Sequence, residues 1–230
     1  MRTLFAVLTF LGFLQASSVA AEDGPLVIEL FTSQGCSSCP PADAMMHDLA
    51  KRDDVIALAL HVDYWDYIGW KDIFGRSENT ARQHAYARAA NATTVYTPQM
   101  VINGTDHVIG SRPMQVMNAI EAHSNRGNPV AVTLTRAGDE VQIKATTSVS
   151  GEFVVQLVRF TPEQTVAISR GENAGHTYSY ANIVKSWDVI GRWNGSGALS
   201  LNADASGSDG LAVIVQRSAS GPIVGAAQLR

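Results

Sequence analysis

The chain contains two cysteines, Cys36 and Cys39, and they form a single Cys-x-x-Cys pair. The apolar, β-branched run at residues 26–31 precedes the pair and is bounded by turn residues, which predicts a buried strand. Residues 40–51 have helical composition, and the prolines that lead them are tolerated in a first turn, where backbone N–H groups have no partner. With Ser38 as the N-cap of this helix, both prolines fall in that turn. The pair is therefore expected at a strand-to-helix junction.

The pair permits several chemistries. A structural zinc site needs four ligands, and the absence of a second cysteine pair disfavours it. A disulfide that only staples the chain stays open as an alternative, but so short a loop gains little from closure, because the gain grows with loop length. The strand-to-helix placement, together with Pro98 ahead of a later strand, favours a redox function.

Residues 1–21 predict a secretory signal peptide. Arg2 precedes an apolar stretch at residues 4–14, and small residues follow up to Ala20 and Ala21, which is the layout of a cleaved signal. The stretch is shorter than the roughly 20 residues of a membrane-spanning helix, so an uncleaved anchor is less favoured. We expect an exported bacterial protein, periplasmic or secreted, with no stable membrane insertion after cleavage. An oxidising compartment permits the cysteine pair to close.

Charge and length bear on partners and organisation. The formal net charge is −4 at pH 7, and the 17 Lys and Arg residues form no basic run, which argues against nucleic acid as a partner. Hydrophobic residues make up 46% of the chain, as in packed globular proteins. A length of 230 residues suits one or two domains, at about 150 residues each.

Residues 22–126 predict an α/β domain. The almost continuous apolar run at residues 55–62 is typical of a strand buried on both faces of a mainly parallel sheet. An Asn-Gly step at residues 103–104 predicts a hairpin. The further expected elements are a helix at 77–90, strands at 95–102 and 107–109, and a helix at 113–123.

Residues 127–230 predict a second domain, all-β and sandwich-like. Short runs in this part alternate apolar and polar residues and are separated by turn signals, which is typical of antiparallel sheets. The expected strands are 130–135, 141–145, 153–160, 165–169, 211–216 and 223–229.

The order of elements, the Cys-x-x-Cys pair and the Thr97-Pro98 step together resemble the thioredoxin-like superfamily. The strings at residues 29–43, 61–66 and 170–177 look more closely like a family of secreted bacterial thioredoxin-like proteins of unknown function with a C-terminal β domain. The resemblance implies a thioredoxin-like fold for the first domain, with Cys36 as the nucleophile at a helix N-terminus and Cys39 as the resolving thiol. It implies no dissociable cofactor and no metal.

The resemblance also implies a substrate-binding surface. Thr97 and Pro98 take the place of the cis-proline step that faces the cysteines and offers backbone groups to an extended substrate segment. Asp63 and Trp65 follow the strand at residues 55–62, at the sheet edge where ligands bind in α/β proteins. These two side chains either line the substrate groove or pack over the end of the sheet.

Glu29 interrupts an otherwise apolar strand. The resemblance implies a buried acid beneath the resolving thiol Cys39, where Glu29 would carry its proton, because burial raises the pKa of a carboxyl. The alternative is a residue at a solvated strand end.

We therefore expect an exported thiol–disulfide oxidoreductase whose partners are protein thiols or disulfides. In this mechanism Cys36 forms a mixed disulfide and Cys39 resolves it. In the reduced protein we expect Cys36 to be the accessible cysteine, because it precedes the helix while Cys39 lies inside the first turn. One alternative is a Cu(I) metallochaperone, since soft thiolates suit that ion and three methionines, Met45, Met46 and Met100, are near in sequence. A second alternative is a non-catalytic binding protein on the same scaffold.

Overall fold

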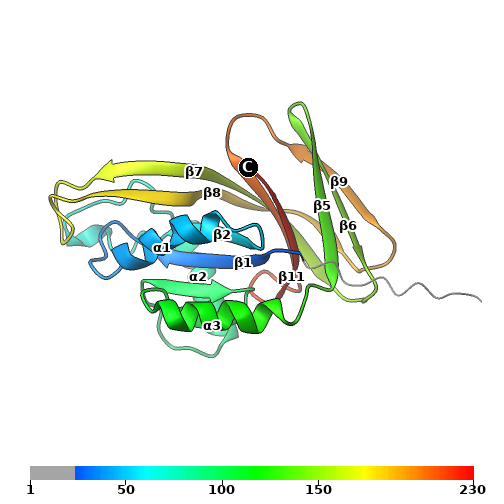
Figure 1. Ribbon diagram of the computed structural model, residues 1–230, viewed down its shortest axis with the longest axis horizontal. Helices are drawn as coiled ribbons and strands as arrows, with labels where there is room; N and C mark the ends of the chain where they lie inside the picture. Colours follow the sequence, from blue (N-terminus) through cyan, green and yellow to red (C-terminus); the bar gives the residue numbers. More distant parts are fainter. Residues whose placement is uncertain (1–23) are drawn as a thin grey trace, which may run out of the picture.

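The computed structural model describes residues 24–230 and has a mixed α/β fold, with one large sheet and one small sheet (Figure 1). The signal peptide expected at residues 1–21 lies outside the described residues. Within the described part, no helix has the length and apolar character needed to cross a membrane.

The first half contains the helices. Its elements are β1 (Leu26–Thr32), α1 (Pro40–Ala50), β2 (Val55–His61), the short 3-10 helix η1 (Asp66–Ile68), α2 (Ser77–Ala89), β3 (Gln99–Ile102), β4 (Asp106–Ile109) and α3 (Pro113–Ser124). The ends of the three α-helices differ from the expected ones by one residue at most.

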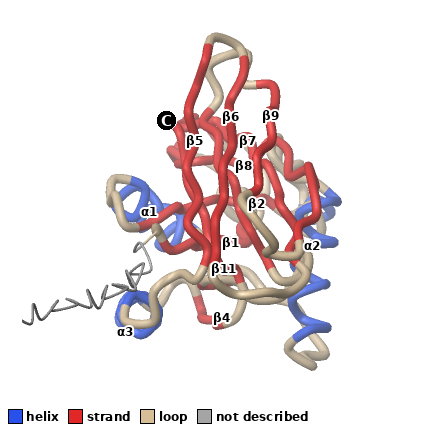
Figure 2. Tube along the Cα trace, turned by 90° about the vertical axis from the view of Figure 1, so that its right-hand side faces the viewer, coloured by secondary structure: helices blue, strands red, loops and turns tan. Residues whose placement is uncertain are grey.

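The second half contains strands only. They are β5 (Val130–Ala137), β6 (Glu140–Thr147), β7 (Phe153–Ala167), β8 (Thr177–Trp193), β9 (Leu199–Asp204), β10 (Gly210–Gln216) and β11 (Ile223–Leu229). Three of them, β5, β6 and β9, form the small sheet, which stands as a separate layer in Figure 2.

The large sheet has eight strands in the order β11-β10-β7-β8-β2-β1-β3-β4. Strands β1 and β2 are parallel, and β3 runs antiparallel to β1 and to β4. The sheet crosses the boundary expected at residue 127, because β8 pairs with β2 through Ala59 and Ile183. The division into two domains stays a prediction, but both halves contribute strands to the same sheet.

Two strands, β8 and β9, were not expected from the sequence, and β7 is one long strand where two were expected. Pro162 lies within β7 and lacks an N–H, so it cannot donate to the ladder. Opposite Pro162, Asn182 of β8 adopts a φ of 49°. The side-chain amide of Asn182 donates to the Ala57 carbonyl oxygen of β2 at 2.8 Å. The side chain of Asn182 thus connects the hairpin to the first half at an irregular point of the ladder.

The alternation along β1 separates two apolar cores. Ile28 and Leu30 pack with the helices α1 and α3. Val27 and Phe31 point to the opposite face and pack with Tyr86 of α2. A third core lies between the small sheet and the β7 and β10 end of the large one. Every residue of β1 is buried, so the loop that follows it leaves the sheet from a fixed position.

Candidate functional site

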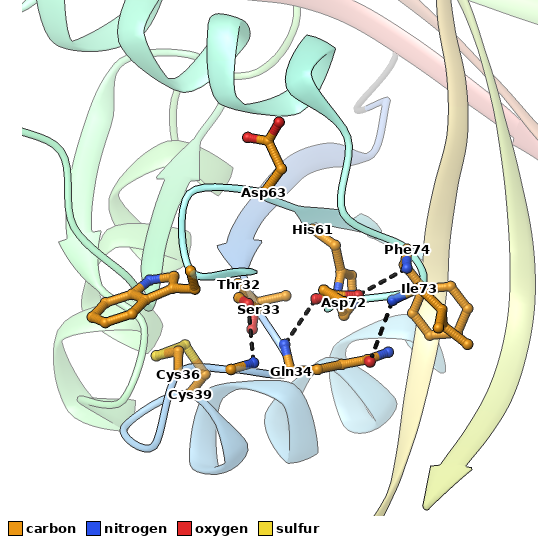
Figure 3. Close-up of polar contacts among 12 residues, drawn as sticks. Thr32, Ser33, Gln34, Cys36, Cys39, His61, Asp63, Asp72, Ile73 and Phe74 are labelled. Carbon is orange, nitrogen blue, oxygen red and sulfur yellow. Dashed lines mark hydrogen bonds and ion pairs between the residues drawn. A yellow bond between two sulfur atoms is a disulfide. The ribbon is translucent and has the colours of Figure 1, made fainter. Parts of the chain in front are cut away.

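Cys36 and Cys39 form a disulfide where the chain passes from β1 into α1 (Figure 3). Cys39 is the N-cap residue of α1 and no side chain caps the helix, so the N-cap role that we expected for Ser38 is wrong. The Ser38 hydroxyl instead lies 3.4 Å from Sγ of Cys36 and donates at 3.4 Å to the carbonyl oxygen of Thr97. The helix therefore starts directly after the second cysteine.

The disulfide is covered. In this oxidised form Cys36 is 2% exposed and Cys39 is fully buried. The expected accessibility of Cys36 concerns the reduced protein and stays a prediction. Trp65 and Ile68 approach the residue before Cys36 so closely that a Cβ on Gly35 would lie 3.3 Å from each. A larger residue at position 35 would displace Trp65 and Ile68, which explains the glycine before the first cysteine.

Thr97 and Pro98 lie beside the cysteine loop. The peptide bond between them is cis, as the resemblance implied. The indole Nε1 of Trp65 donates to the Thr97 hydroxyl at 2.8 Å, and Ser38 reaches the Thr97 carbonyl. The structure thus brings together three of the expected site features, namely the cysteine loop, the Thr97-Pro98 step and Trp65.

Asp63 lies elsewhere. Its carboxylate points away from the disulfide (Figure 3) and accepts a hydrogen bond of 2.6 Å from the hydroxyl of Thr80 in α2. The Asp63 N–H lies 3.3 Å from the same hydroxyl. Asp63 therefore anchors the first turns of α2, and its expected place in a substrate groove gains no support from this geometry.

Glu29 is buried, but not in the expected place. Its side chain shares the face of Val27 and Phe31, opposite the face that packs with α1. There its carboxylate is paired with Arg82 at 2.5 and 2.9 Å and accepts a hydrogen bond from Tyr86 Oη at 2.5 Å. The expectation that Glu29 lies beneath Cys39 fails because the strand period of two directs it away from the helix that carries the cysteine.

The backbone just before Cys36 is held by side chains from two distant segments. Asp72 accepts a hydrogen bond from the Gln34 N–H at 2.8 Å, and Trp70 Nε1 donates to Oε1 of Gln34 at 2.8 Å. Asn173, from the connection between β7 and β8, donates to the carbonyl oxygens of Gln34 at 2.9 Å and Cys36 at 3.1 Å. None of these partners is adjacent to the cysteines in sequence.

Three buried titratable groups lie under this loop. Asp43, in the first turn of α1, accepts a hydrogen bond of 2.7 Å from Thr32. Burial raises the pKa of Asp43 to about 6, although His61 and Thr32 partly oppose this rise. His61 Nδ1 lies 2.7 Å from Oδ2 of Asp72, and both side chains are fully buried. Burial also acts to raise the pKa of Asp72, but His61 and hydrogen bonds to the carboxylate outweigh it, so the pKa lies below its ordinary value.

The opposite directions of these two shifts give the carboxyls different chemistry. Near neutral pH Asp72 is a fixed anion that orients His61 and the Gln34 backbone. Asp43 can gain or lose a proton close to that pH, and its own N–H bonds to the Cys39 carbonyl within the first helical turn. Asp43, rather than Glu29, is thus the acid closest along the helix to the second cysteine.

Two comparisons place the chain among known proteins. A family model described as "Protein of unknown function (DUF1223)" matches residues 27–216. The chain belongs to this family. The crystal structure of a protein from Agrobacterium tumefaciens, solved by a structural genomics consortium, is 38% identical, with a TM-score of 0.79 over 91% of this chain and 96% of that one. A search for functionally curated relatives gives no match.

The DUF1223 match extends from β1 into β10, so it includes the cysteine loop and Asn173 alike. Our interpretation of the sequence missed Gln34, Asp43, Asp72 and Asn173. Asn173 lies in the string at residues 170–177 that contributed to the resemblance, and this was the available signal. Asp43 lies four residues after Cys39, on the same face of the helix, a spacing that also pointed to contact with the loop.

The methionines expected near a Cu(I) site do not gather around the sulfurs as a group. Met46 and Met100 are buried in the apolar core between α1, α3 and the sheet, and Met45 packs against that core. Within residues 24–230, no group of three or more His, Cys, Asp and Glu side chains is arranged to hold a metal ion. No specific observation therefore favours the metallochaperone alternative.

Proposed function

We propose that this DUF1223 protein is an exported thiol–disulfide oxidoreductase with a thioredoxin-like fold, acting on protein thiols or disulfides. The observation that carries the proposal is the Cys36–Cys39 disulfide at the N-terminus of α1, with Thr97 beside it. A helix N-terminus stabilises a thiolate, which is the species that attacks disulfides.

The arrangement around the disulfide supports the thioredoxin-like part of the proposal. The strands β2, β1, β3 and β4 are neighbours in that order, and the helices α1 and α3 cover one face while α2 lies on the other. The β1-α1-β2 unit is parallel and the β3-β4 hairpin is antiparallel. Along the chain, these elements follow one another in the order on which the resemblance rested for residues 22–126.

The sulfur chemistry of the reaction takes place between the two cysteines and a partner. In the reducing direction the Cys36 thiolate attacks a substrate disulfide, which forms a mixed disulfide and releases one substrate thiolate. Cys39 then attacks Sγ of Cys36, which restores the Cys36–Cys39 disulfide and releases the second substrate thiolate. Two electrons pass from the protein dithiol to the substrate, and the same steps in reverse oxidise a substrate dithiol.

Asp43 takes the proton-carrying role that we expected of Glu29. Cys39 must lose its proton before it attacks the mixed disulfide, and a carboxylate with a pKa of about 6 can accept that proton near neutral pH. The burial of Asp43 and its place one helical turn from Cys39 support this assignment.

The test is a disulfide exchange assay on the mature chain, residues 22–230. We expect it to accelerate the reduction of insulin by dithiothreitol, and Cys36→Ser to abolish the acceleration. Cys39→Ser should accumulate mixed disulfides with protein partners, because the resolving step is lost. An insulin rate equal to that of dithiothreitol alone, with no mixed disulfide from Cys39→Ser, would contradict the proposal and leave a binding role. Stoichiometric tight binding of Cu(I) to the reduced but redox-inactive chain would instead favour the metallochaperone.

A further inference from the structure

The tip of the β7–β8 hairpin, residues 168–176, lies over the loop that precedes Cys36. In Figure 1 this tip is at the same end of the molecule as the connection between β1 and α1. The tip is closed by backbone hydrogen bonds between Ile168 and His176 at 2.9 Å and between Gly175 and Ile168 at 2.8 Å. It is a structured turn, built on the longest strand pair of the sheet.

Asn173 connects this tip to the cysteine loop. The residue is 5% exposed, and its Nδ2 donates to the carbonyl oxygens of Gln34 at 2.9 Å and Cys36 at 3.1 Å. A side-chain amide nitrogen has two hydrogens, so it can make both bonds at once. One buried side chain from the second half therefore fixes two backbone groups around the first cysteine.

The tip is itself fixed against the opposite side of the loop. Gly171 has a φ of 78°, and a Cβ at that position would lie 3.1 Å from Cβ of Trp70. Trp70 in turn donates to the side chain of Gln34, and Asp72 accepts the Gln34 N–H. Trp70 and Asp72 hold Gln34 independently of Asn173. Removal of Asn173 therefore frees mainly the backbone on the Cys36 side of the loop.

The two cysteines differ in how they are held. Cys39 is the N-cap residue of α1, which packs on the sheet through Ala42, Met46 and Leu49. Cys36 lies in the loop outside any helix or strand, and its position depends on the hydrogen bonds of that loop. We therefore expect the distance between the two sulfurs in the reduced protein to depend mainly on the Cys36 side of the loop.

We propose that Asn173 is a positioning residue for Cys36, holding its sulfur close to that of Cys39 and so favouring the disulfide over the dithiol. This inference rests on the proposed redox role of the pair. Restricting the loop raises the effective concentration of one thiol at the other. The equilibrium is that of the protein disulfide and two glutathione thiols with the protein dithiol and one glutathione disulfide. One S–S bond breaks, one forms, and two electrons pass to the protein.

The experiment measures this equilibrium in the full mature chain. Wild type and Asn173→Ala are incubated in glutathione buffers of graded ratio, quenched with acid and alkylated, and the fraction of disulfide is read by mass spectrometry. We expect the variant to shift the equilibrium toward the dithiol by about 5- to 50-fold, the size expected for the loss of two hydrogen bonds. Asn173→Asp, which keeps the size of the side chain but turns a carboxylate toward two carbonyls, should shift it in the same direction.

Asn128→Ala is the matched control. Asn128 is 3% exposed, and its Nδ2 also donates to two backbone carbonyls, those of Gly24 at 2.9 Å and Pro25 at 3.3 Å, just before β1. We expect this variant to lose stability in a denaturant titration but to keep the wild-type glutathione equilibrium within about twofold, since general stability and loop position are separate.

Each outcome decides the inference. An unchanged equilibrium in both Asn173 variants makes Asn173 a structural residue and overturns it. An equal shift in Asn128→Ala also overturns it, because the effect then follows general stability. A shift confined to the Asn173 variants supports it, even if the chain fails to reduce insulin, since glutathione exchange requires no protein substrate. Failure of the inference and failure of the proposed function are therefore distinguishable.

Discussion

Asp43→Asn is expected to stabilise the folded protein at pH 7 by about 3 kcal/mol and to slow disulfide exchange by about 10²- to 10⁴-fold. Burial raises the pKa of Asp43 from its ordinary 3.8 to about 6, so between these two values the folded protein binds a proton that the unfolded chain releases. The contribution of Asp43 therefore lowers stability as the pH rises from about 4 to about 6, and the loss persists above that range. Asparagine removes the charge and still accepts the Thr32 hydrogen bond.

Urea unfolding of the wild type and Asp43→Asn between pH 4 and 8 measures the first effect. The difference in unfolding free energy between them should grow between pH 4 and 6 and stay constant above. His61, His47 and Asp72 also act on the Asp43 carboxyl, so the rise spreads over more than one pH unit. Two parallel stability profiles would show that Asp43 ionises in the folded protein as it does in water.

Insulin reduction at pH 7 measures the second effect. Asp48→Asn is the control, because Asp48 lies on the same helix with its side chain 84% exposed. This variant should keep both the exchange rate and the pH profile of the wild type. Normal exchange in Asp43→Asn would rule out Asp43 as the proton carrier, while leaving the roles of the two cysteines unaffected.

The part of the site that the sequence could predict is local. The Cys-x-x-Cys pair, the strand before it and the helix after it are adjacent in the chain, and apolar periodicity is enough to predict them. The Thr97-Pro98 step was also expected beside the cysteines, but only through the resemblance. In contrast, the hydrogen bonds of Asn173 to Gln34 and Cys36 join residues about 140 positions apart, and no local pattern encodes such a pairing.

The errors have the same physical origin. Strand β8 escaped prediction because bulges and the left-handed Asn182 interrupt its alternation, and much of it is only partly buried. The burial of Glu29 could be predicted from its apolar neighbours in the sequence, but its pairing with Arg82 could not. The choice between a contact with Cys39 and one with Arg82 depends on which helix covers each face of β1, and that is a property of the tertiary structure.

Arg82→Met is expected to lower the free energy of unfolding by about 3 to 5 kcal/mol, the cost of leaving one partner of a buried ion pair without the other. Glu29 is fully buried and Arg82 is 9% exposed, with N–O distances of 2.5 and 2.9 Å. The guanidinium also lies 3.7 Å from the ring centroid of Trp187 in β8 and donates to the Ala219 carbonyl. Its loss thus weakens the contact of α2 with both halves of the chain.

The double variant Glu29→Gln/Arg82→Met separates charge from packing. Removing both charges avoids the unpaired buried carboxylate, so the double variant should recover most of the stability that Arg82→Met loses. The glutamine amide oxygen can still accept the hydrogen bond from Tyr86, whose hydroxyl lies 2.5 Å from the native Glu29 carboxylate. A double variant as unstable as Arg82→Met would show that the loss comes from packing around the guanidinium, not from the unpaired charge.

The single variants Glu29→Gln and Asp43→Asn decide whether Glu29 or Asp43 carries the proton. Because Glu29 points away from α1 and toward Arg82 and Tyr86, Glu29→Gln should leave disulfide exchange by the folded protein within about threefold of wild type, far from the roughly 10²-fold or greater loss of a proton carrier. The measurement is insulin reduction under conditions where denaturant titration shows the variant to be folded. A loss of that size in Glu29→Gln, with normal exchange in Asp43→Asn, would identify Glu29 as the proton carrier. It would also require a path for the proton from the core around α2 to Cys39.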